Sequence, residues 1–178
     1  NKLAGLLWPT FPDQRAKHSL RQALAHLRKT IGDREAEPPF LLITRQTIQW
    51  NEASDFSADT HHLSHITNAN DLLSYHGELL DGFFLDDCYE FQEWLTIQRE
   101  AWRHAVLQQY ARLLGEQESA EQYTTMRDTA QNWLQLDPWH EEAYRALMRA
   151  HVALGDQAAA LTVYDKCREV LAAEFGIE

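Results

Sequence analysis

The stretch EEAYRALMRAHVALGDQAAALTVY, residues 141–164, decides the fold because it has the layout of a helix pair. Large residues lie one turn apart, a glycine breaks the chain, and a small and a large residue follow in the second half. These positions are filled by Tyr144, Leu147, Gly155, Ala160 and Tyr164. Because a small residue lets antiparallel helices approach closely while large ones fill the groove beside it, we expect a helix pair over residues 140–174, with Ala160 at the close crossing.

The same layout recurs 34 residues earlier in the chain. That spacing is the period of tetratricopeptide repeats, in which stacked helix pairs bury a shared core. Pro138 closes the earlier unit, and Glu121 stands where its turn would have a glycine, so this unit matches the pattern less well. The aligned positions are Tyr110 with Tyr144, Leu113 with Leu147, Leu114 with Met148, Tyr123 with Gln157, and Met126 with Ala160. The period predicts a tetratricopeptide-like α-helical module.

Helical periodicity begins near Asp71 and continues to the end of the chain, which predicts four or five helices. The expected interruptions are Asp81-Gly82, Gly115-Glu116, Asp137-Pro138 and Gly155-Asp156. The preceding stretch, Glu52 to Asn70, is polar and has few apolar anchors. We therefore expect a linker there with one short helix.

A helix and a β-hairpin are predicted before this linker. Apolar residues recur at intervals of three or four positions on one face of a helix over residues 16–31, at Ala16, Leu20, Leu24, Leu27 and Ile31. Pro38-Pro39 then opens two short segments, residues 40–44 and 47–50, that are rich in strand-favouring residues. Arg45 lies between them, so we expect it at the hairpin tip.

Charge is divided unevenly along the chain, whose formal net charge is −11. Residues 1–50 carry eight basic and four acidic residues, a net charge of +4, whereas the other 128 residues carry eight basic and 23 acidic ones, a net charge of −15. Nucleic-acid phosphates attract a basic surface and repel an acidic one. The division near Trp50 indicates that a part facing nucleic acid is joined to a part facing protein.

Several short motifs, in order along most of the chain, resemble a known family of regulators. They are Gly5-Leu6-Leu7-Trp8-Pro9, the run His18 to Lys29, Ile43-Thr44-Arg45, Tyr75 to Phe83, Phe91 to Leu95 with Arg99-Glu100, Leu136-Asp137-Pro138, and Glu141 to Met148. The first three are similar to the end of a response-regulator-type winged helix. The others are similar to the bacterial transcriptional activator domain of the antibiotic-regulatory (SARP-type) family.

The resemblance implies a mainly α protein with two parts. Residues 1–51 would be the C-terminal part of a winged-helix DNA-binding domain, and residues 52–178 a tetratricopeptide-like bacterial transcriptional activator domain. The strands and first helix of a winged helix are absent, and Gln46 stands where the family's wing often has glycine. Because the chain starts at Asn1 inside an apolar segment, we expect a fragment of a longer, cytoplasmic regulator.

Candidate DNA-contacting residues lie mainly on the helix of residues 16–31. The face opposite its apolar stripe carries His18, Gln22, His26 and Lys29, and Arg15, Lys17, Ser19, Arg21 and Arg28 lie on or near its flanks. Arginine and lysine can hold phosphates, while glutamine and histidine can read base edges. Arg45 could enter an adjacent minor groove, as wing arginines do in the resembling family. The alternative is a merely solvated basic face.

A candidate partner-binding site lies at Phe83-Phe84, where two aromatic rings stand beside Asp86-Asp87. Apolar anchors with an acidic rim suit a small interface with the transcription machinery or a regulatory protein. The alternative is that the aromatic residues are core, which helical spacing favours for most of the set, with Phe83 and Phe84 as the candidates for exposure. The set is Phe83, Phe84, Phe91, Trp94, Trp102, Tyr110, Trp133, Trp139 and Tyr144. Stoichiometry is left open, with a homodimer among the alternatives, and so is a tetratricopeptide-type adaptor that binds only proteins.

Other classes of function find little support in the sequence. The longest apolar runs are far too short to cross a bilayer, and no secretory signal is visible. His61, His62 and His65 lack partners at zinc spacing, and His140 to Tyr144 begins like a zinc-protease helix but lacks the second histidine. No phosphate-binding glycine loop is present, and Cys88 and Cys167 fit buried thiols. We expect no enzyme activity, metal or cofactor.

Overall fold

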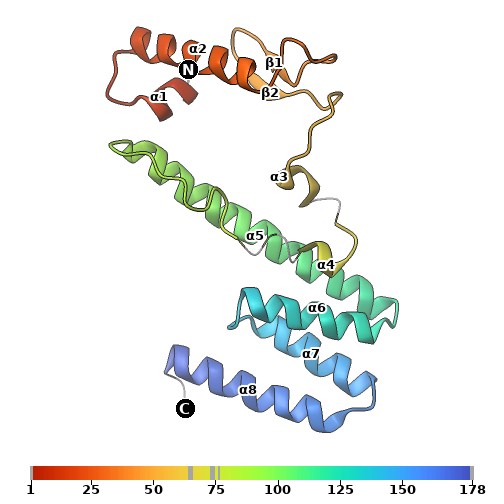
Figure 1. Cartoon of the computed structure of the whole chain (residues 1–178). Coiled ribbons are helices and arrows are strands. Elements are labelled where there is room, and N and C mark those ends of the chain that lie inside the picture. Colours follow the sequence, from red (N-terminus) through yellow and green to blue (C-terminus); the bar gives the residue numbers. More distant parts are fainter. Residues whose placement is uncertain (1, 64–65, 73–74, 76, 177–178) are drawn as a thin grey trace. The chain divides into compact units, whose positions relative to one another are not determined.

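The computed structural model describes residues 2–63, 66–72, 75 and 77–176 (Figure 1). It is mainly helical and has one two-stranded antiparallel hairpin among these residues, so the predicted mainly α architecture is confirmed. No helix among the described residues is long and apolar enough to span a membrane. The elements are α1 Lys2–Leu7, α2 Asp13–Thr30, β1 Leu41–Ile43, β2 Ile48–Trp50, α3 Asp59–His62, α4 Ala69–Leu72, α5 Tyr89–Ser119, α6 Tyr123–Leu136, α7 Glu141–Ala153 and α8 Gln157–Phe175.

The chain divides into two compact units. The first unit comprises Asn1–Ala58 and Gly82–Gln98, and the second comprises Asp59–Asp81 and Arg99–Glu178. Helix α5 therefore contributes its first turns to the first unit and the rest to the second. The domain boundary expected between residues 51 and 52 stays a prediction.

The first unit contains the predicted helix and hairpin. Helix α2 closely matches the expected residues, and β1 pairs with β2 in the register Leu41 to Trp50 and Ile43 to Ile48. Of the residues in α2, only Ala16 is buried. A separate small core forms where Cys88, Phe91 and Leu95 pack against Leu6, Leu7 and Leu85.

The second unit is a series of packed helices with one large core. Helix α6 packs against α7, and α7 against α8 (Figure 1). Buried residues of α5, α6 and α7 form the core together with Leu63, Ile66, Leu72 and Tyr75. In this core Tyr110 stacks on Trp133, with the ring centroids 5.7 Å apart. Burial raises the pKa of Tyr110 to about 12. Cys167 on α8 and Cys88 in the first unit are free and buried, as expected.

The helices of the second unit repeat at the predicted interval. Helix α5 ends at Ser119 and α7 at Ala153, while α6 begins at Tyr123 and α8 at Gln157, so both matching boundaries are 34 residues apart. The two turns match as well, since Glu121 has a φ of 56° and Gly155 a φ of 84°. Both positions thus have the left-handed backbone with which such turns close.

One predicted helix interruption is wrong, and the linker holds more structure than expected. Helix α5 continues through Gly115-Glu116 to Ser119. Glycine in a helix costs about 1 kcal/mol, but Leu113, Leu114 and Gln117 are buried around this point, and burial of large side chains outweighs that cost. Two short helices, α3 and α4, begin in the linker, where one was expected.

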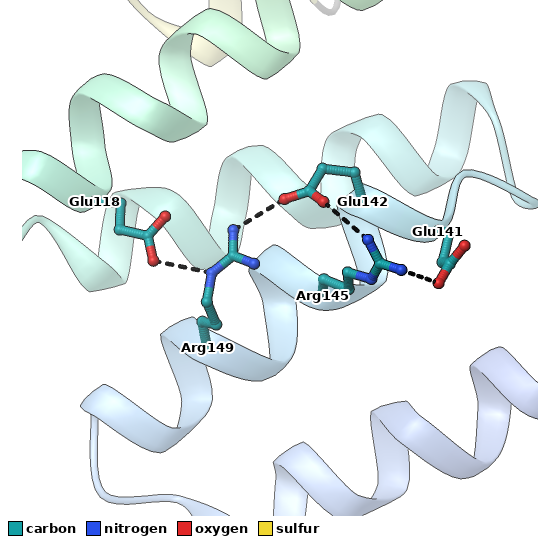
Figure 2. A network of polar contacts seen from close by, with 5 residues as sticks. All are labelled: Glu118, Glu141, Glu142, Arg145 and Arg149. Atoms are coloured by element: carbon teal, nitrogen blue, oxygen red, sulfur yellow. Dashed lines mark hydrogen bonds and ion pairs between the residues drawn. The ribbon is translucent and has the colours of Figure 1, made fainter.

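A network of ion pairs joins α5 to α7 in the second unit (Figure 2). The Nε of Arg149 on α7 lies 2.9 Å from Glu118 on α5, and its second nitrogen lies 3.0 Å from Glu142. Arg145 continues the chain of contacts to Glu142 and Glu141. All five side chains are partly exposed, so each pair contributes little alone, but together they orient the outer faces of the two helices.

Candidate nucleic-acid interface and partner surface

The ten predicted DNA-contacting side chains all belong to the first unit and reach solvent. Nine lie on α2, and Arg45 lies in the turn between β1 and β2. Lys17, Ser19 and Arg28 are half-buried; the exposed members are Arg15, His18, Arg21, Gln22, His26, Lys29 and Arg45. The structure thus brings them onto one helix and one hairpin, and their contact with DNA stays a prediction.

A buried carboxylate fixes the end of α2 to the hairpin. Arg28 donates from Nε to Asp33 over 2.5 Å, and the backbone amide of Leu41 in β1 donates to the other oxygen of Asp33 over 2.7 Å. The Arg28 hydrogen bond holds the pKa of the Asp33 carboxyl below its usual range, against the effect of burial, and the Leu41 amide adds to this. Asp33 therefore stays charged at neutral pH and sets how the helix and the hairpin sit relative to each other.

Sequence reasoning missed this role of Asp33. The Gly32-Asp33 pair signals only a helix end, because nothing in the spacing shows that β1 returns to it. A carboxylate that directly follows a helix with arginines in its last turns is a weak signal that could have suggested it. The contact also means that the Nε of Arg28 is already engaged within the first unit.

The hairpin tip is closed by threonines instead of glycine or asparagine. The hydroxyl of Thr44 accepts hydrogen bonds from the amides of Gln46 and Thr47, at 3.1 and 3.0 Å. The amide of Thr44 donates to the carbonyl of Thr47 over 2.9 Å. Side-chain hydroxyls can satisfy turn amides in this way. The turn therefore forms without the residues that a tight hairpin usually requires, and Arg45 is exposed on it.

A groove of about 830 Å³ lies between α1, α2 and the hairpin. Its walls are partly apolar, with Leu3, Leu20, Leu24, Ile43 and Ile48, and its basic members are Lys2, Lys17, Arg21 and Arg45. The groove thus divides the predicted DNA-contacting set, because Lys17, Arg21 and Arg45 line it while His18, Gln22, His26 and Lys29 are not among its lining residues.

Phe83 and Phe84 are exposed and belong to an aromatic surface of the first unit. Phe84 is 66% exposed and Phe83 47%. The Phe83 ring meets the buried Phe91 ring edge-on at 5.7 Å, and Phe91 contacts Trp94 at 5.5 Å. Other exposed apolar residues nearby along the chain are Tyr89, Trp94 and Ile97, and the exposed acidic ones are Asp86, Asp87, Glu90 and Glu93.

Of the nine aromatic residues considered from the sequence, only some are buried in a core. Phe91, Tyr110, Trp133 and Tyr144 are buried, as the core interpretation expects. Trp94 and Trp139 are exposed along with the two phenylalanines, and Trp102 packs against the main core while partly buried. Exposure makes Phe83 and Phe84 available to a partner, whose binding stays a prediction.

The histidines do not form a metal centre in the described part of the chain. No three His, Cys, Asp or Glu side chains there are grouped so that they could hold an ion. His65, the third member of the histidine cluster considered from the sequence, lies outside the described residues. His140 packs against Trp133 with ring centroids 4.0 Å apart, and burial lowers its pKa despite nearby Asp137 and Glu142.

The chain matches the sequence model of a known protein family. A sequence model of the family described as "Bacterial transcriptional activator domain" matches residues 51–178. No curated protein matches the chain. The matched residues cover the linker and every helix from α3 to α8, and they begin after the basic helix and hairpin.

Proposed function

The chain belongs to the bacterial transcriptional activator domain family, and we propose that it regulates transcription by binding double-stranded DNA. In this proposal α2 and the hairpin tip contact the duplex, and the acidic helices contact the transcription machinery or a regulatory protein in the cytoplasm. The family is regulatory, and no catalytic role is proposed.

One observation carries the DNA-binding half of the proposal, namely the Asp33 contact that fixes α2 to β1. An exposed basic helix alone would be a solvated surface, but here the helix and Arg45 are held on one rigid frame. Arg15, Arg21 and Lys29 would neutralise phosphates, while Gln22 and His18 would meet base edges. Residues 1–50 carry a net charge of +4, which favours such contacts.

The partner-binding half rests on exposure and charge. The exposed rings of Phe83 and Phe84 offer apolar anchors, and Asp86 and Asp87 beside them would attract a basic patch. The net charge of −15 over residues 51–178 disfavours DNA as the partner of this part. A tetratricopeptide-type adaptor that binds only proteins is the alternative outcome of the experiment below.

The experiment measures duplex binding at several salt concentrations. Replacing Arg21 and Lys29 with alanine removes two charges, so we expect weaker binding to all duplexes and a salt dependence whose logarithmic slope falls by about 2. The matched control, Arg103→Ala with Arg127→Ala, removes the same charge from the second unit and should leave the slope unchanged. Equal slopes for both double variants would reject DNA binding by this surface.

A second variant separates partner binding from DNA binding. Phe84→Ser should leave duplex affinity and the melting temperature intact, because the ring is exposed, yet lower activation of a reporter promoter. Unchanged activation would remove the partner role from this surface.

A further inference from the structure

Helix α8 leaves exposed a position that its counterpart α6 buries. With the 34-residue offset of the two helix pairs, Tyr164 on α8 occupies the position of Ala130 on α6. Ala130 is fully buried in the core that α6 shares with α7. Tyr164 is 52% exposed, and Leu161, one turn before it, is 67% exposed. The position that packs against another helix in the first pair is therefore open in the second, where it holds a large aromatic ring beside the exposed Leu161.

The flank of α8 at this position carries one acidic and one basic side chain. Leu161, Tyr164 and Arg168 are spaced by three and four residues, so they follow one another along the helix. Its charged members are Asp165, four residues after Leu161, and Arg168, a net charge of zero in a chain whose net charge is −11. Two such acidic chains repel each other, and the repulsion is weakest where the surfaces that meet are neutral.

The pair Asp165 and Arg168 is loosely held within the chain. Their nearest atoms lie 3.9 Å apart, and both side chains are largely exposed. Such a pair contributes little to stability, so either member can exchange its partner for one on another chain without much loss.

We propose that the flank of α8 formed by Leu161, Tyr164 and Arg168 docks against the same flank of a second copy of the chain. An interface between identical copies has twofold symmetry, so this flank must complement itself. With the two α8 helices antiparallel about an axis between Tyr164 and Asp165, Leu161 meets the stem of Arg168 of the second copy. The guanidinium of that arginine then reaches Asp165 of the first copy across the axis. The Tyr164 rings of both copies cover the centre of the interface.

The proposed dimer is independent of DNA binding, because it uses a different helix and a different partner. It is tested by sedimentation velocity of the whole chain over a range of protein concentrations. We expect a dimer that dissociates on dilution, and Tyr164→Glu should weaken dimerisation at least tenfold, on the order of a hot-spot residue. Because the ring is exposed in the single chain, the melting temperature of the dilute variant should match that of the dilute parent.

Val152→Glu is the matched control, since Val152 on α7 is 54% exposed and the same charge is introduced in the same unit. It should leave dimerisation unchanged. A parent chain that is monomeric at every concentration would overturn the proposal, as would a dimer that Tyr164→Glu does not weaken or that Val152→Glu weakens as much.

A charge exchange tests the antiparallel arrangement. Arg168→Asp should weaken the dimer, because it places like charges across the axis. Adding Asp165→Arg to it restores opposite charges between the copies and should restore most of the affinity. Failure of the double variant to recover would reject the pairing of Asp165 with Arg168.

Discussion

The two helix pairs of the second unit share a register but fill their interiors differently. In the first pair, residues 107–119 of α5 with α6, the large side chains Tyr110, Met126 and Trp133 pack in the core. At the positions that match Met126 and Trp133, the second pair of α7 and α8 has Ala160 and Cys167, which are also buried. The second helix of the first pair therefore buries large side chains where that of the second pair buries small ones, and small side chains let helices approach closely.

The pairs also differ in how well their buried polar groups are satisfied. Among the described residues, the buried side-chain atoms without a hydrogen-bond partner are those of Gln117, Thr129, Trp133 and His140. The first three belong to the first pair, and His140 precedes α7. Buried polar groups without partners cost free energy, so the first pair gains more from packing and loses more to desolvation.

The largest expected effect comes from giving the first pair an interior residue of the second. Trp133→Cys should lower the free energy of unfolding by about 3–5 kcal/mol, because a fully buried indole leaves a cavity that rigid helices cannot fill. Urea unfolding followed by circular dichroism, at one fixed protein concentration, measures it. Cys167→Ala, the matched change in the second pair, removes one sulfur atom and should cost much less. Comparable losses from both would show that volume does not distinguish the pairs.

A smaller effect, of opposite sign, is expected at Thr129. Its hydroxyl is buried without a partner, and the matching residue of the second pair is Val163. Thr129→Val keeps the shape and removes the unsatisfied group, so the free energy of unfolding should rise by about 1–2 kcal/mol. Thr125→Val on the exposed side of α6 is the control and should change stability little. A loss of stability at Thr129 would mean that its hydroxyl is hydrogen-bonded in solution.

Periodicity and turn residues were enough to predict most of this architecture. The spacing from Tyr110 to Tyr144 and the breaks at Asp137-Pro138 and Gly155 gave the helix pairs, since these signals are local. The continuation of α5 through Gly115 was missed because burial of neighbouring side chains outweighs a local preference.

The candidate site was predictable as a set of residues but not as an arrangement. Helical spacing placed the basic side chains on α2. The Asp33 contact depends on β1 returning to the end of α2. The groove depends on α1, α2 and the hairpin meeting. Neither arrangement can be predicted from the periodicity of the sequence. Phe83 and Phe84 were singled out as candidates for exposure, but burial stayed an alternative because helical spacing does not show tertiary packing.

The smallest expected effects lie at the two turns, where the pairs have the same backbone and different residues. Glu121 and Gly155 both have left-handed φ values, 56° and 84°. That conformation costs a residue with a Cβ about 1 kcal/mol but costs glycine nothing in sterics. No atom lies within 4 Å of a Cβ built on Gly155, so an added methyl group would meet no neighbour and any loss would come from the backbone alone.

Exchanging the turn residues therefore tests whether the two turns are equivalent. Glu121→Gly should raise the free energy of unfolding by roughly 0.5–1 kcal/mol, and Gly155→Ala should lower it by about 1 kcal/mol. Glu121→Ala separates the backbone from the carboxylate, because it keeps the Cβ and removes the charge, and it should leave stability near that of the parent. Thermal melts at fixed concentration compare the variants. If Glu121→Ala stabilises as much as Glu121→Gly, the cost at this turn lies in the charge, and the two turns are not equivalent in their backbone strain.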